Sequence, residues 1–118
     1  MDFTALDKMV LSQYSSIEKK CIYRVVFASM TINDESDAKE LRILEKIADI
    51  LGLSQEERED SERLPDPTIV ETIQEMSEVK RAYVARFLAE MFLADGKVTG
   101  SEQDFFHVLL EQLNLPNE

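Results

Sequence analysis

The chain has 118 residues, a length typical of one domain, and 44% of them are hydrophobic, which excludes an intrinsically disordered protein. Its 24 acidic and 13 basic residues give a formal net charge of −11, so phosphate backbones and anionic lipid would repel it, and we expect neither nucleic acid nor membrane surfaces as partners. With three Gly and three Pro the chain is poor in turn residues, which favours helices over an all-β fold.

The single cysteine, Cys21, excludes an intramolecular disulfide and is typical of a reducing compartment. The first residues are acidic where a signal peptide needs a basic region. Apolar runs also fall short of the roughly 20 residues that span a bilayer. These features predict a cytoplasmic protein without direct membrane insertion.

Apolar residues recur at helical spacing, which predicts helices along the first half of the chain. A short helix covers residues 3–11. Ser15 and Glu18 form a capping-box pattern that opens a helix to about Ile32, and Gly52 ends the next helix because glycine tolerates the left-handed C′ position. The residues predicted to face inward are Ile17, Cys21, Val25, Ala28, Leu41, Leu44, Ala48 and Leu51.

A charged run, 54–63, separates the two halves and contains no expected core residue. We predict a solvated linker there, although Ser54 and Glu57 form a pattern that can cap one short turn of helix. After it, Asp66 is the predicted N-cap and Pro67 the first residue of a short helix.

Two longer helices are predicted in the second half. Ser77 caps the first of them, and the last helix runs from about Gly100 to Leu113. The residues predicted to face inward are Val79, Ala82, Tyr83, Phe87, Leu88, Met91, Phe92, Phe105, Phe106, Leu109, Leu110 and Leu113.

An internal repeat becomes visible when the chain is shifted by 62 positions. Residues 15–53 then align with 77–115 without a gap, and the helix stop Gly52 meets Asn114, the next-best left-handed residue. We therefore predict an all-α fold, in which residues 1–118 form a single compact helical domain of six to seven helices with two pseudo-symmetric helical hairpins. A shorter helix precedes each hairpin, where the sequence does not keep the 62-residue register.

The segment 94–106 has two interpretations. In the first, Gly96 ends a helix, Thr99 caps the next, and Glu102 completes a capping box. In the second, the pattern D-G-x-V-x-x-x-E binds a metal ion, because it matches four positions of a calcium-binding EF-hand loop. Met91 and Leu93 occupy the first and third ligand positions of that loop and lack side-chain oxygens, which excludes an EF-hand.

Several segments resemble the TerB-like tellurite-resistance family over roughly residues 15–115. They are the L-P-D-P helix start, F-L-A-E-M-F-L-A-D-G, V-T-x-S-E and the terminal L-x-x-L-N-L, set in two helical halves. The resemblance implies a compact all-helical domain without enzymatic activity. It also implies a divalent-cation site built from loop acids of both halves, for Ca²⁺ in preference to Mg²⁺ or Mn²⁺, and a link to bacterial stress responses and membrane-associated metal-sensing complexes.

Four acids are the metal ligands that the resemblance implies. Asp95 and Glu102 match the family motif, Glu40 is equivalent to Glu102 in the first half, and Asp34 adjoins the position equivalent to Asp95. The chain departs from the family pattern in its first half, which lacks the Asp-Gly pair, and in Lys97, which adds a positive charge to the second. Carbonyls and water would complete the coordination, so we expect weak dissociation constants, on the order of 10⁻⁴–10⁻³ M.

We therefore expect a non-enzymatic domain whose acidic interhelical segments accept a cation or the basic surface of a protein partner, in a monomer or a homo-oligomer. The alternative is a pure protein-interaction scaffold in which the loop acids are helix caps. Cys21 is predicted to be buried and His107 to lie at the surface, and the sequence contains no phosphate-binding loop, zinc-ligand spacing or nucleophile elbow that would favour catalysis.

Overall fold

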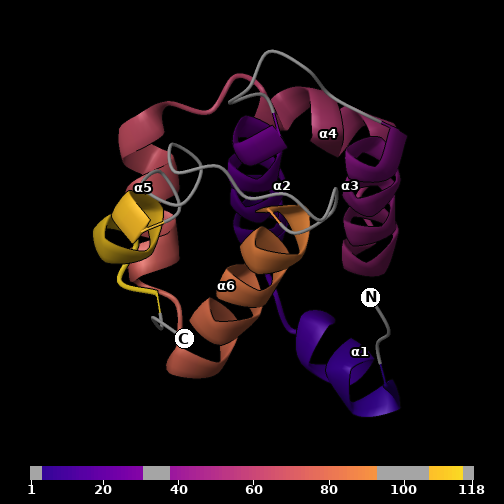
Figure 1. Ribbon diagram of the computed structural model, residues 1–118, viewed down its shortest axis with the longest axis horizontal. Helices are drawn as coiled ribbons and strands as arrows, with labels where there is room; N and C mark the ends of the chain where they lie inside the picture. Colours follow the sequence, from indigo (N-terminus) through magenta and orange to yellow (C-terminus); the bar gives the residue numbers. More distant parts are fainter. Residues whose placement is uncertain (1–3, 31–37, 93–106, 116–118) are drawn as a thin grey trace.

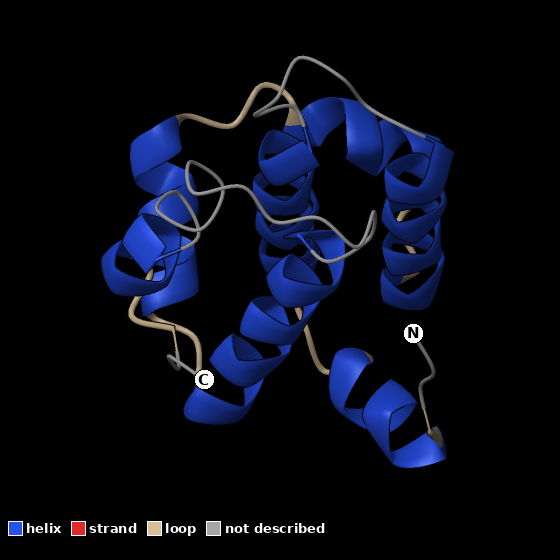
Figure 2. Ribbon diagram, in the orientation of Figure 1, coloured by secondary structure: helices blue, strands red, loops and turns tan. Residues whose placement is uncertain are grey.

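The computed structural model describes residues 4–30, 38–92 and 107–115, and its regular structure there is entirely helical (Figure 2). The all-α class predicted from the sequence is confirmed. The helices are α1 (Ala5–Leu11), α2 (Ser16–Met30), α3 (Ala38–Leu51), α4 (Gln55–Ser61), α5 (Asp66–Gln74) and α6 (Glu78–Phe92), followed by a helical segment at 107–112.

Helices α2 and α6 form the centre of the molecule (Figure 1). In this view α1 and α3 lie on one side of the pair, and α5 and the segment 107–112 lie on the other. Helix α2 packs against α3, α4, α5 and α6. A helix with so many neighbours needs an apolar surface wider than one stripe, and Ile22 and Val26 are accordingly buried beside the predicted Cys21 and Val25.

Some residues predicted to face inward are exposed. The wrong predictions are Ile17, Leu41, Val79 and Ala82. Ile17 (40% exposed) and Val79 (57% exposed) are equivalent positions of the repeat, and each lies in the first turn of a central helix. Among the described side chains of α6, the predicted Phe87 and Leu88 are fully buried, and so is Val84, which was not predicted. Periodicity shows which residues share a face of a helix, but not how far along that face a neighbour extends.

The two hairpins end in the same backbone motif, one repeat length apart. After each helix comes a residue with left-handed backbone angles, Gly52 at φ 69° and Asn114 at φ 56°. The leucine that follows then donates its amide back to the helix, as the Schellman motif requires. The two bonds are Leu53 N to Ala48 O (3.0 Å) and Leu115 N to Leu110 O (2.8 Å). The coordinates thus confirm the predicted equivalence of Gly52 and Asn114.

The repeat also extends further towards the N-terminus than the sequence indicated. Shifting α1 by 62 residues places it on α5 to within one residue at either end. The turns that follow are equivalent too, because Tyr14 N donates to Leu11 O at 3.4 Å and Met76 N donates to Ile73 O at 3.1 Å. All four of these side chains are buried. The prediction that the register is lost before the hairpins was wrong, because it compared side-chain types, and the shared features here are burial and backbone geometry.

Capping boxes begin three helices. The pairs are Thr4 with Asp7, Ser15 with Glu18 and Ser54 with Glu57. At α6 the predicted cap Ser77 accepts the amide of Lys80 at 3.3 Å. The predicted start of α5 was wrong by one residue, because Pro65 is the N-cap, Asp66 the first helical residue and Pro67 the second. Proline fits there because the first-turn amides have no partner within the helix.

The charged run 54–63 is not a solvated linker, because α4 forms within it and packs against α2. Ser61 is fully buried and donates its hydroxyl hydrogen bond to the carbonyl oxygen of Arg58 at 2.6 Å. The prediction failed because it required an apolar face, whereas the buried residue of α4 is a small polar one, Ser61. A helix of seven residues is marginal alone, so its contacts with the rest of the fold must stabilise it.

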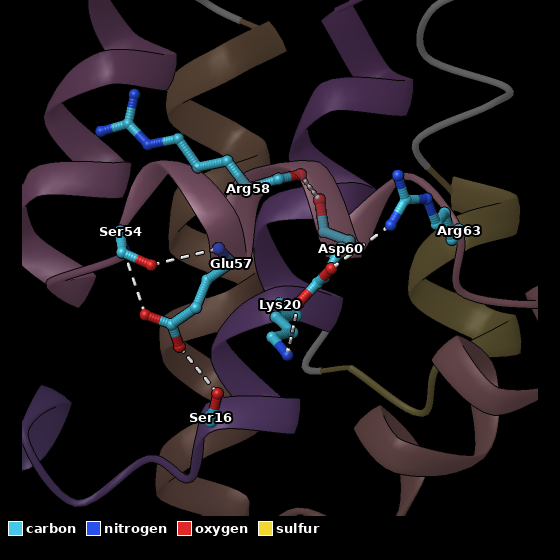
Figure 3. A network of polar contacts seen from close by, with 8 residues as sticks. Ser16, Lys20, Ser54, Glu57, Arg58, Asp60 and Arg63 are labelled. Carbon is cyan, nitrogen blue, oxygen red and sulfur yellow. Dashed lines mark hydrogen bonds and ion pairs between the residues drawn. The ribbon is translucent and has the colours of Figure 1, made fainter.

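Polar contacts attach α4 to its neighbours (Figure 3). Glu57 accepts a hydrogen bond from the hydroxyl of Ser16 at 2.7 Å, in addition to capping its own helix. Ion pairs also join Lys20 to Asp60 (3.5 Å) and Arg58 to both Glu45 (3.0 Å) and Asp49 (3.6 Å). Single exposed pairs contribute little, but this set connects α4 to both α2 and α3.

Candidate functional site

The four predicted metal ligands fall mostly outside the described residues. Asp34, Asp95 and Glu102 lie outside them, and Glu40 is the third residue of α3, with a side chain that is not described. Among the described residues there is no group of three or more His, Cys, Asp or Glu side chains that could hold a metal ion. The cation site therefore remains a prediction.

The structure instead reveals a polar cluster where the two halves of the repeat meet. The ammonium of Lys80, near the start of α6, lies 2.9 Å from the carboxylate of Glu18, near the start of α2. These residues are 62 positions apart, which is the repeat length. Two equivalent points of a twofold object touch only where both lie close to the axis. The pseudo-twofold axis predicted from the sequence would therefore pass close to the Glu18–Lys80 ion pair.

Glu18 has two roles in this cluster. It accepts the amide of Ser15 at 2.8 Å, completing the capping box of α2, and it accepts a hydrogen bond from Lys80. Burial by itself would raise the pKa of Glu18, but the Ser15 amide and the Lys80 ammonium outweigh this and hold the pKa below its usual range. The carboxylate is thus kept ionised, and it links the first turn of one half to the other half.

Tyr14 completes the cluster. Its hydroxyl donates to the carbonyl oxygen of Lys80 at 2.7 Å, and the Lys80 ammonium lies 5.2 Å from the centre of its ring. Burial, and then the negative charge of Glu18, raise the pKa of the Tyr14 hydroxyl, which stays protonated. The equivalent residue, Met76, is also buried but lacks a hydroxyl. The hydrogen bond that Tyr14 forms to Lys80 therefore has no counterpart from Met76.

A second polar cluster attaches α1 to α6. The hydroxyl of Tyr83 donates to the carboxylate of Asp7, and Arg86 forms an ion pair with the same carboxylate at 3.6 Å. The Tyr83 hydroxyl, followed by the amide of Thr4, lowers the pKa of Asp7, and the hydrogen bond to Asp7 raises the pKa of Tyr83. The carboxylate is fully engaged in holding the two helices, which is a structural role.

Cys21 and His107 lie as the sequence predicted. Cys21 is fully buried, and burial raises the pKa of its thiol despite a hydrogen bond with Thr72, so the reactive thiolate is suppressed. His107 is exposed at the start of the segment 107–112. A buried thiol with a raised pKa is a poor nucleophile.

Sequence reasoning missed both polar clusters, although one signal was available. Glu18 and Lys80 both occupy the third position of a helix after an equivalent serine, so the repeat alignment already paired them. A pair of opposite charges at equivalent positions is a reason to look for a contact across a symmetry axis. The link between Asp7 and Tyr83 had no such signal, because it depends on how α1 packs.

Within residues 4–30, 38–92 and 107–115, no helix is both long enough and apolar enough to cross a membrane.

Comparisons with known proteins support the fold alone. No protein-family model matches the chain, and no curated protein matches it in sequence. It is similar to the crystal structure of a protein of unknown function, PG1108, from Porphyromonas gingivalis W83, with a TM-score of 0.75. The identity is 18%, and the match covers 89% of this chain and 88% of that one. A likeness at this identity shows a shared helical architecture and carries no function with it.

Proposed function

We propose that the protein is a non-enzymatic interaction domain of the TerB-like kind, which binds a protein partner in a bacterial stress or metal response. The observation that carries this proposal is the axial contact of Glu18 with Lys80, 2.9 Å across equivalent positions. A contact between equivalent residues is what a pseudo-twofold relation of the two halves predicts, and under that relation the segments between α2 and α3 and after α6 would be equivalent. Paired equivalent segments are suited to present one composite binding surface.

The proposed ligand of these segments is a divalent cation, Ca²⁺ in preference to Mg²⁺ or Mn²⁺. Asp34, Glu40, Asp95 and Glu102 would hold it, and carboxylate oxygens are the ligands that such hard cations prefer. The cation would neutralise part of the strongly acidic surface when bound, and thereby change which partner surfaces the protein accepts. What supports this is the repeat together with the family resemblance.

A second candidate is a pure interaction scaffold, and a specific observation favours it. In the described residues, the pattern of Ser or Thr followed three residues later by Asp or Glu forms a capping box at α1, α2 and α4. Thr99 and Glu102 have the same spacing. If Glu102 serves as a cap, its carboxylate is committed to a backbone amide and fewer oxygens remain for a cation.

Calorimetric titration separates the two candidates when capping and charge are removed independently. Glu102→Gln keeps the capping box, because glutamine also serves at that position, but removes the charged ligand. Thr99→Ala removes the cap and keeps the carboxylate. Cation binding predicts that Ca²⁺ produces saturable heat in the wild type and in Thr99→Ala, and that Glu102→Gln and Asp95→Asn abolish it.

The matched control is Glu56→Gln, which removes the same charge from an exposed position on α4. It should leave the Ca²⁺ titration unchanged. Equal titrations in all variants, together with a lower melting temperature in Thr99→Ala alone, would leave the scaffold as the function and remove the cation from it. Capping losses are expected at about 0.5–2 kcal/mol.

A further inference from the structure

A groove between α2, α5 and the segment 107–112 is separate from the predicted cation ligands. Its volume is about 230 Å³, and most of its wall is aliphatic, including Ile69, Val70 and Leu109. Its polar lining residues are Arg24, Asp66 and Gln112. Small-molecule sites are commonly concave, largely apolar and provided with a few polar groups that orient the ligand. The groove has this composition.

Arg24 is the unusual residue in this groove. Three arginines, Arg24, Arg58 and Arg81, have a buried Nε atom without a hydrogen-bond partner. Arg58 uses its other nitrogens to bind Glu45, and Arg81 donates to the carbonyl oxygen of Asn114 at 2.9 Å. Within the part of the chain that the structure describes, the Arg24 guanidinium has no acidic partner and packs instead 5.9 Å from the ring of Phe27.

The repeat explains what Arg24 lacks. Its equivalent in the second half, Arg86, forms an ion pair with Asp7 of α1 at 3.6 Å. The residue 62 positions after Asp7 is Ile69 of α5, which lines the groove together with Arg24. The same architecture therefore places a counter-charge beside one arginine and an aliphatic wall beside the other. Among the described residues, Arg24 is thus a partly buried cation with an aliphatic side chain at the position where Arg86 has its counter-ion.

We infer that this groove binds a small aliphatic carboxylate, with the carboxylate on the Arg24 guanidinium and the hydrocarbon chain against the aliphatic wall. A guanidinium matches a carboxylate geometrically and in charge, and the chain would cover apolar surface that is now exposed to water. Asp66 lies in the same groove and would repel a second negative charge more than a single one, so we expect a monocarboxylate to bind in preference to a phosphate or dicarboxylate.

The probe that tests the site is sodium octanoate, titrated into the full chain in the presence of a chelator and followed by calorimetry and backbone amide NMR shifts. Arg24→Met keeps an unbranched apolar side chain and should weaken octanoate binding about tenfold or more. Asp66→Asn should strengthen it about threefold by removing a repelling charge near the surface. Arg42→Met, which removes an exposed arginine of α3, should leave the affinity unchanged.

Two further compounds, octylammonium and acetate, test separately whether binding needs the negative charge and the hydrocarbon chain. The site predicts that octanoate binds, that octylammonium with the opposite charge does not, and that acetate without a chain does not. Equal binding of octanoate and octylammonium, or an affinity that Arg24→Met leaves unchanged, would overturn the inference. So would a lack of saturable octanoate binding at millimolar concentrations. Misfolding cannot imitate the result, because Asp66→Asn is expected to increase affinity and a thermal melt checks each variant.

Discussion

The axial ion pair makes a prediction that depends directly on the internal symmetry. Glu18 and Lys80 occupy equivalent positions and contact each other, so exchanging them should rebuild the same contact in the opposite direction. In the double variant Glu18→Lys with Lys80→Glu, the new carboxylate at position 80 would accept the amide of Ser77. Half of that capping box already exists, because the Ser77 hydroxyl accepts the amide of position 80 at 3.3 Å.

The size of the effect follows from the burial of the pair. The side chains of Glu18 and Lys80 are 16% and 22% exposed, so the pair is intermediate between a surface ion pair and a buried one. Surface pairs contribute up to about 1 kcal/mol, and breaking a buried pair costs about 3–5 kcal/mol. Each single reversal places two like charges in contact, and we expect it to lower the free energy of unfolding by about 2–4 kcal/mol. The exchanged double variant should return to within about 1 kcal/mol of the wild type.

Urea unfolding of the four proteins at neutral pH, analysed as a double-mutant cycle, measures this coupling. The control is the same exchange at Asp60 and Arg63, an exposed pair at 3.7 Å, where the coupling should be below about 1 kcal/mol. If the two reversals at Glu18 and Lys80 simply add, the two side chains do not interact across the halves. The symmetry argument behind the proposed function would then lose its basis.

Three further predictions test other parts of the structure. Gly52→Ala should cost about 1 kcal/mol in urea unfolding, because φ is 69° there, whereas Gly52→Asn, which copies the second half, should cost less. The lowered pKa of Glu18 gives stability that is present above its ordinary value of 4.5 and is lost as pH falls through the folded value. Glu18→Gln should therefore lose less stability than wild type from about pH 5 to about pH 3. Ser61→Leu should cost about 1–3 kcal/mol by overpacking α4, and unchanged unfolding would mean that α4 is not docked.

Some features of this protein could be predicted from the sequence, and others could not. The capping boxes at Ser15 and Ser54 and the left-handed stop at Gly52 involve residues within five positions of one another, so local pattern suffices to predict them. The groove at Arg24 was not predictable in this way. Its walls come from α2, α5 and 107–112, and its character depends on an acid that is present in one half and absent at the equivalent place in the other.

The sequence by itself determined the helical class, the positions of most helix ends and the 62-residue repeat, because these follow from apolar spacing and from backbone hydrogen bonds between near neighbours. Only the tertiary structure decided that the charged run 54–63 is a packed helix and that Ile17 and Val79 face water. It alone also decided that Glu18 meets Lys80. These outcomes depend on which surfaces lie opposite each residue, and a single chain segment does not encode the position of its neighbours.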